Sequence, residues 1–278
     1  MPDWTRWLTP WRRRPPTIPA VRLHGVIGCT GIVGGRGLTL AGIERALDAA
    51  FGHRHAPAVA LLINSPGGSP VQSAQIAGRI RALAEEKGKP VLAFVEDVAA
   101  SGGYWLACAA DEIFADPASI VGSIGVISAG FGFEDALARL GIERRVHATG
   151  EHKGMLDPFR PERPGDLELL RAIHADILQG FVAHVRARRG DRLAADDADL
   201  FDGRVWTGTA ALPLGLIDGL GEARAVIRRR FGAKARLVVA NPRRGLLRRL
   251  RSRTEPAHAL EELFAALEAR ALWRRYGL

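Results

Sequence analysis

Two glycine-rich turns, each following an apolar run, are the features of this 278-residue chain that suggest chemistry. The first is NSPGGS at residues 64–69, and the second is ASGG at residues 100–103. A turn between a strand and a helix lies at the carboxyl end of the strand, where α/β proteins place their sites. Paired glycines let backbone N–H groups face a ligand without a Cβ in the way. Two such turns on adjacent strands can therefore supply the two donors of an oxyanion hole.

Ser101 is the candidate nucleophile of the second turn. Its hydroxyl is expected at a helix N-terminus beside the amide of Gly102, which is a favourable position for a nucleophile. Serine is also favoured as the N-cap of a helix, where its side chain bonds the backbone instead. The residue types alone leave both interpretations open.

A serine nucleophile needs a base, and none of the eight histidines lies in a setting that resembles a triad histidine. Only four of the 39 basic residues are lysine, and one of them, Lys153, lies in the segment HATGEHKGMLDPFR. A lysine whose pKa is depressed by burial can accept the serine proton, whereas arginine cannot. The Ser-Lys dyad is an established variant of the catalytic triad. The alternative is that Lys153 is a solvated loop residue beside a surface-exposed His152.

Other site chemistries are disfavoured. Neither turn matches the GxGxxG or P-loop patterns of nucleotide sites, and no lysine lies near either turn. Cys29 and Cys108 have neither metal-type nor redox-type spacing, so both are predicted to be small core residues. We predict no metal ion and no cofactor.

The elements that position these turns alternate along the chain. Apolar runs at residues 21–28, 56–64, 90–97 and 112–117 predict strands, and residues 38–52, 71–88 and 164–189 have helical patterns. Strands that are apolar throughout and alternate with helices indicate a sheet covered on both faces. The predicted fold class is therefore α/β.

The net charge of +9 is concentrated at the two ends of the chain. Residues 1–20 carry +3 and residues 222–278 carry +10, whereas residues 21–221 carry −4. A nucleic-acid-binding core is therefore disfavoured. The Trp- and Arg-rich start lacks a continuous apolar run of the secretory type, and either contacts a membrane interface or packs on the body. The basic stretch 243–253 likewise either binds anionic lipid or forms a solvated helix face.

Four blocks of sequence, taken together, resemble the signal peptide peptidase A family of serine peptidases. They are INSPGGSP (63–70), VEDVAASGGYWLACAADEIFADPASIVGSIGVI (95–127), GEHKGMLDPFRP (150–161) and DGRVWTGTAALPLGLIDGLG (202–221). The resemblance covers residues 21–235. It divides the chain into an N-terminal segment and Pro linker (1–20), a peptidase domain (21–235) and a basic C-terminal extension with an amphipathic helix (236–278).

The resemblance implies a role for five residues. Ser101 falls on the family's nucleophile, and Lys153, 52 residues later, falls on its general base. Ser123 falls on the serine that hydrogen-bonds the lysine amine, and the amides of Gly68 and Gly102 fall on the oxyanion hole. The spacing of Ser101 and Lys153 resembles that of the short, single-domain bacterial members.

The family resemblance also implies a fold, partners and a location. The fold is the ClpP/crotonase-like spiral of ββα units. Short members are homo-oligomers with shared active sites, so we expect Lys153 to serve Ser101 of another copy. The implied substrates are extended, mostly apolar peptides such as signal-peptide remnants. Many members begin with a membrane anchor, which residues 1–20 do not resemble, so we expect a cytoplasmic protein that contacts the inner membrane peripherally.

Three other functions are disfavoured by the residues present. A ClpP-type Ser-His-Asp peptidase needs a histidine about two dozen residues beyond Ser101, and residues 120–132 contain none. A crotonase-type acyl-CoA enzyme lacks the nucleophilic serine that this chain offers together with Lys153. A catalytically silent scaffold at the membrane surface is disfavoured because both dyad residues and both turns are present.

Overall fold

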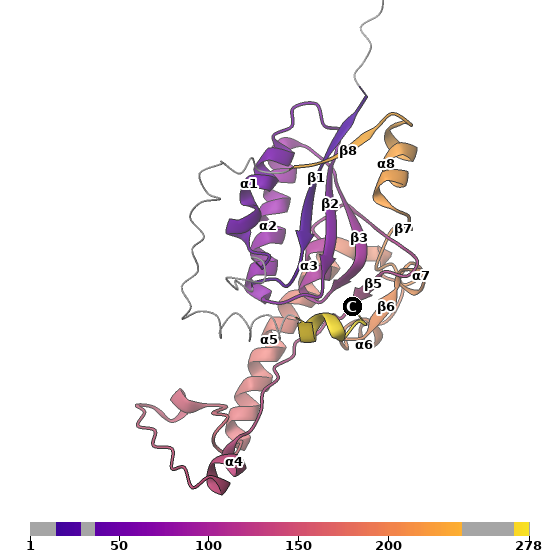
Figure 1. Cartoon of the computed structure of the whole chain (residues 1–278). Coiled ribbons are helices and arrows are strands. Elements are labelled where there is room, and N and C mark those ends of the chain that lie inside the picture. The colour runs from indigo at the N-terminus through magenta and orange to yellow at the C-terminus, as the bar shows by residue number, and fades with distance from the viewer. Residues whose placement is uncertain (1–14, 29–36, 241–269, 278) are drawn as a thin grey trace, which may run out of the picture.

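The computed structural model describes residues 15–28, 37–240 and 270–277 of the chain (Figure 1). The predicted Trp-rich face of residues 1–11, Cys29 and the basic stretch 243–253 lie outside the described residues. Within the described ranges, no helix combines the length and the apolar character needed to cross a bilayer.

A single sheet forms the centre of the molecule. Its main strand order is β6-β5-β3-β2-β1-β8, and β4 and β7 extend it from β3; all pairs are parallel except β5 with β6. The strands are β1 (Thr17–His24), β2 (Val59–Ser65), β3 (Val91–Ala100), β4 (Glu112–Ala115), β5 (Ile120–Gly122), β6 (Val205–Thr207), β7 (Gly219–Leu220) and β8 (Arg236–Val239). β1 begins at Thr17 and pairs with β8, so the sheet extends past both predicted domain borders, at residues 20 and 235.

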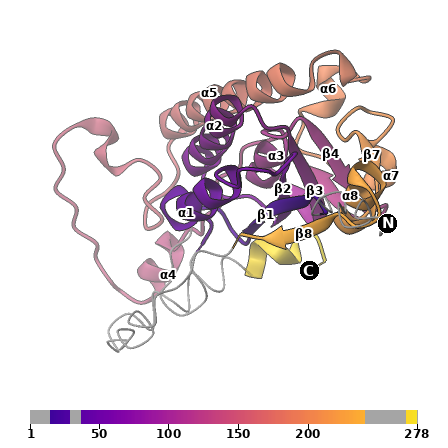
Figure 2. The same cartoon turned by 90° about the horizontal axis from the view of Figure 1, so that it is seen from above.

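Helices cover both faces of this sheet (Figure 2). They are α1 (Leu40–Phe51), α2 (Pro70–Lys87), α3 (Gly102–Ala107), α4 (Glu134–Arg139), α5 (Pro164–Arg189), α6 (Asp197–Leu200), α7 (Gly208–Ala211) and α8 (Ala223–Phe231). Alternate residues of β2 enter two separate cores: Leu61 packs with α1, α2 and α3, and Leu62 packs with α8. This double burial explains the uninterrupted apolar runs and confirms the predicted α/β class.

On the side away from β2, strand β3 pairs with two different strands along its length. Its first half, Leu92–Val95, pairs with β4, and its second half, Val98–Ala100, pairs with β5. The two residues between the halves, Glu96 and Asp97, are exposed. This division places the end of β5 beside the end of β3, where the second glycine-rich turn begins.

A long arm formed by residues 125–163 projects from the sheet, with α4 at its far end and the first half of α5 beside it (Figure 1). Its large apolar side chains are unusually exposed: Phe131 by 81%, Leu140 by 72% and Ile142 by 53%. The first half of α5, beside the arm, also exposes an apolar side chain, Ile173. The second half of α5 instead enters the core through Phe181 and Val185. The arm thus presents apolar surface that the rest of the described chain does not cover.

Candidate active site

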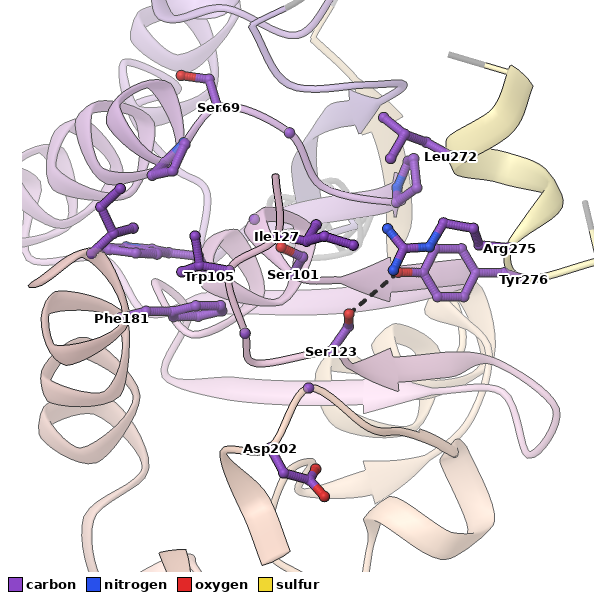
Figure 3. Close-up of a pocket in the computed structure, with 18 residues that line it drawn as sticks. Ser69, Ser101, Trp105, Ser123, Ile127, Phe181, Asp202, Leu272, Arg275 and Tyr276 are labelled. Carbon is purple, nitrogen blue, oxygen red and sulfur yellow. Dashed lines mark hydrogen bonds between the residues drawn. The ribbon is translucent and has the colours of Figure 1, made fainter. Parts of the chain in front are cut away.

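Ser101 occupies a strained turn between β3 and α3. Its backbone has φ 51° and ψ −123°, a combination that a non-glycine residue adopts at an energetic cost. Ser101 stands at the N-cap position of α3, yet its side chain makes no capping hydrogen bond. Its hydroxyl lies in a pocket of about 620 Å³ (Figure 3). Of the two interpretations of this serine, the geometry favours the nucleophile.

Gly68 and Gly102 line the same pocket as Ser101. Gly102 is the first residue of α3, so its N–H has no partner within the helix. At the other turn, Ile27 bonds the residues on either side of Gly68: its N–H donates to Gly67 at 2.8 Å, and its carbonyl accepts from Ser69 at 2.9 Å. Both glycine N–H groups are therefore left available for an oxyanion.

Close packing explains why the first turn needs glycine. Gly67 has φ 105° and Gly68 has φ 138°, a region that side-chain-bearing residues rarely adopt. A Cβ on Gly67 would lie 2.8 Å from the Cβ of Ser101, and one on Gly68 would clash with the carbonyl of Ile27. The two turns are thus in direct contact across the end of the sheet.

The buried Ser65 fixes the shape of the first turn. Its hydroxyl donates to the carbonyl of Gly25 at 2.7 Å and accepts from the N–H of Gly67 at 3.2 Å. These two hydrogen bonds tie the turn at Gly67 to the backbone at Gly25. Ser65 was not among the site residues predicted from the sequence, although it lies within the NSPGGS turn.

Ser123 lies at the wall of the same pocket, directly after β5. Its backbone also has a positive φ, of 52°, and its N–H donates to the carbonyl of Arg204 at 2.7 Å. Its hydroxyl accepts a hydrogen bond from the hydroxyl of Tyr276 at 3.4 Å (Figure 3). The structure thus brings together four of the five predicted site residues: Ser101, Ser123, Gly68 and Gly102.

One end of the pocket is apolar. Trp105 of α3 stacks on Phe181 of α5, with ring centroids 4.7 Å apart (Figure 3). Ile127 and Ile177 also line the pocket. His184 also stacks on Trp105, with ring centroids 5.3 Å apart, and its Nε2 is 3.1 Å from the Trp105 carbonyl. Burial lowers the pKa of His184, which favours its neutral form, and the ring packs against Trp105 without lining the pocket. These aromatic residues were not predicted as site residues.

The opposite end of the pocket is closed by the C-terminal residues. Residues 270–274 form a short helical turn, and Leu272, Arg275 and Tyr276 line the pocket opposite Trp105 (Figure 3). Asp202 lies on the rim and is held by Arg204. The C-terminal residues and the first residues of the arm thus meet at one site, although they are far apart in sequence.

Lys153 is the predicted site residue that does not line the pocket. It is exposed, lies in the 3₁₀ helix η2 (Glu151–Gly154) of the arm, and makes no ion pair within the part of the chain that the structure describes. Lys89, by contrast, donates to the carbonyls of Phe51 and His53, both at 2.7 Å, and closes the end of α1. No histidine lines the pocket among the described residues either. Within the described part of one copy, therefore, neither a lysine nor a histidine lines the pocket beside Ser101, Gly68 and Gly102.

Comparison with known proteins gives a family match. Residues 83–235, more than half of the chain, match peptidase family S49. The matched region contains Ser101, Ser123 and Lys153, together with the whole arm.

Several curated proteins are similar over longer or shorter parts of the chain. A Na(+)/H(+) antiporter NhaA of Brucella abortus is 50% identical over 272 residues, which cover 94% of this chain and 37% of that protein. A chloroplastic serine protease SPPA of Arabidopsis thaliana is 36% identical over 59% of this chain and 24% of its own. Protease 4 of Haemophilus influenzae is 34% identical over 64% and 29%. The chain thus spans less than two fifths of the length of each of these relatives.

Proposed function

The chain belongs to peptidase family S49, and on this basis we propose that it is a serine endopeptidase that uses Ser101 as nucleophile and Lys153 as general base. The observation that carries the proposal is the arrangement around Ser101. It combines a strained turn, a hydroxyl that makes no capping bond, and two glycine amides in one pocket that make no hydrogen bond among the described residues. Nucleophilic catalysis requires such an exposed hydroxyl beside preorganised donors.

The reaction proceeds through an acyl-enzyme. The neutral amine of Lys153 takes the Ser101 proton while Oγ attacks the peptide carbonyl, and the N–H groups of Gly68 and Gly102 stabilise the oxyanion that forms. Collapse of the intermediate breaks the C–N bond, and Lys153 returns the proton to the leaving amine. Water, deprotonated by the same amine, then attacks the ester and releases Ser101.

Lys153 reaches the pocket of a neighbouring copy in this proposal. The arm that carries it extends away from its own sheet and exposes Phe131, Leu140 and Ile142. Apolar surface of this kind is typical of a protein interface. Docking the arm on a second copy would bury these side chains and would carry the Lys153 amine out of bulk water to the pocket, where it can accept the proton of Ser101. Ser123 would then hold the amine in place.

The substrates proposed are extended, mostly apolar peptides, such as signal-peptide remnants. The apolar end of the pocket, with Trp105, Phe181 and Ile177, suits a large apolar side chain next to the scissile bond.

We also propose a cytoplasmic protein that contacts the inner membrane peripherally through its basic ends.

Hydrolysis of an unfolded casein or of an apolar fluorogenic peptide tests the proposal. We expect Ser101→Ala and Lys153→Ala to abolish turnover while their thermal unfolding remains that of the parent chain. Lys234→Ala, which removes another exposed lysine, is the matched control and should keep full activity. Full activity of Lys153→Ala would show that the dyad is assigned wrongly.

Mixing the two inactive variants tests whether the site is shared. A mixed oligomer contains pockets that combine Ser101 of one copy with Lys153 of another, so activity should reappear. An oligomer that forms but stays inactive after mixing would place the base in the same chain as the nucleophile.

A further inference from the structure

The C-terminal segment, residues 270–277, lies across the mouth of the pocket that contains Ser101. Leu272, Arg275 and Tyr276 form one wall, and Leu272 and Tyr276 are half-buried there (Figure 3). The neighbouring Arg274 is exposed and does not line the pocket. The segment therefore presents a defined face to the site.

Tyr276 contacts Ser123, the side chain that holds the amine of Lys153 in the proposed mechanism. Its hydroxyl donates to Oγ of Ser123, at 3.4 Å, and its ring occupies the space in front of that hydroxyl. Arg275 adds a positive charge to the same wall. A lysine that approaches Ser123 from outside therefore meets an aromatic ring and a like charge, both of which oppose its entry.

We propose that residues 270–277 are an inhibitory segment that competes with Lys153 of a neighbouring copy for the space at Ser123. This inference rests on the proposed function. The segment and the lysine exclude each other, so the site is complete only after the segment has left.

The size of the contact is consistent with this role. Only three residues of the segment reach the pocket, and Tyr276 makes one long hydrogen bond there. A docking arm with several exposed apolar side chains can displace a contact of three side chains and one long hydrogen bond. By linkage, a segment that opposes docking must also weaken the association of two copies.

Self-association measured by sedimentation velocity over a range of protein concentrations tests the inference without using catalysis. A segment that occupies the site about 90% of the time raises the apparent dissociation constant of the oligomer about tenfold. We therefore expect Leu272→Asp in the full chain, which removes the segment from the pocket, to lower this constant about tenfold. Arg274→Ala, in the same segment but outside the pocket, should leave the constant unchanged. Equal constants in all three proteins, or no association in any of them, would overturn the inference.

Peptide hydrolysis provides the second measurement. Leu272→Asp and Tyr276→Phe should raise kcat/KM, most strongly at low protein concentration, where the segment competes best. A fall in kcat/KM of Tyr276→Phe would mean that Tyr276 positions Ser123 for catalysis, and would refute the inhibitory role. If no variant hydrolyses peptides, the proposed function fails, and the sedimentation result still decides this inference.

Discussion

Ser101 and Ser123 leave two adjacent parallel strands at paired positions. Ala100 is in register with Gly122, and the N–H of Ser101 donates to the carbonyl of Gly122 at 2.8 Å. Both serines then turn away from the sheet with nearly equal positive φ values, 51° and 52°. The ladder between β3 and β5 thus fixes the two hydroxyl-bearing residues relative to each other, and the strain of each turn directs its side chain to the pocket.

The strain at Ser101 predicts a difference between two inactive variants. Glycine tolerates a φ of 51°, whereas alanine lacks the hydroxyl but keeps the strained Cβ. We therefore expect Ser101→Gly to have a free energy of unfolding about 1 kcal/mol above that of Ser101→Ala. Urea denaturation of the two proteins measures this difference. Identical stabilities would mean that the turn at Ser101 stores no strain.

The turn at Gly68 predicts a loss of activity on adding one methyl group. In Gly68→Ala the new Cβ meets the carbonyl of Ile27, so the turn shifts and its N–H no longer faces the oxyanion. Loss of one such donor lowers kcat by about 10²- to 10³-fold. Steady-state kinetics on an apolar peptide measures the effect.

Gly78→Ala is the control for this substitution. Gly78 lies inside α2, where a Cβ meets no atom within 4 Å, so alanine should stabilise the helix by about 0.5–1 kcal/mol and leave kcat unchanged. A Gly68→Ala protein with the kcat of the parent chain would exclude this amide from the oxyanion hole.

His184 predicts a pH dependence of stability. Burial lowers its pKa below the ordinary value of 6.5, so the unfolded chain binds a proton at a higher pH than the folded one. The stability contributed by the neutral ring is complete above pH 6.5 and decreases as the pH falls toward the pKa of the folded state. Melting temperatures between pH 8 and pH 5 should show a steeper decline for the parent chain than for His184→Gln. His55→Gln, at an exposed position, should follow the parent chain, and parallel curves for all three would contradict the assignment.

A buried ion pair predicts the largest stability loss outside the site. Arg189 is 2% exposed and donates to both carboxylate oxygens of Asp218, at 2.7 and 3.1 Å. Asp218→Asn leaves the guanidinium buried without its counter-charge, which costs about 3–5 kcal/mol. Asp199→Asn breaks an exposed pair with Arg204 and should change the free energy of unfolding by less than about 1 kcal/mol. Chemical denaturation compares the two, and equal effects would refute the special role of the buried pair.

Much of the fold could be predicted because its elements are encoded locally. The pattern of residues 164–189 predicted a helix that the structure places at Pro164–Arg189, and the helical pattern in residues 38–52 contains α1. Cys108 is buried, as predicted. The division of β3 between β4 and β5 was not predictable, because pairing depends on residues far apart in the chain and no local pattern records it. The pairing of β8 with β1 escaped prediction for the same reason.

For the site, the sequence by itself predicted which residues carry the chemistry, and it determined the family to which the chain belongs. Four blocks of residue types at fixed spacing indicate Ser101, Ser123, Lys153 and the glycine turns, since glycine and serine are required there for reasons that a short segment expresses. Only the tertiary structure decided which of these residues meet. It brought two turns and Ser123 together through strand pairing, added Trp105 and Phe181 as an apolar wall, placed Tyr276 against Ser123, and left Lys153 on the exposed arm. Contacts of this kind depend on the packing of distant elements, which residue types and spacing do not specify.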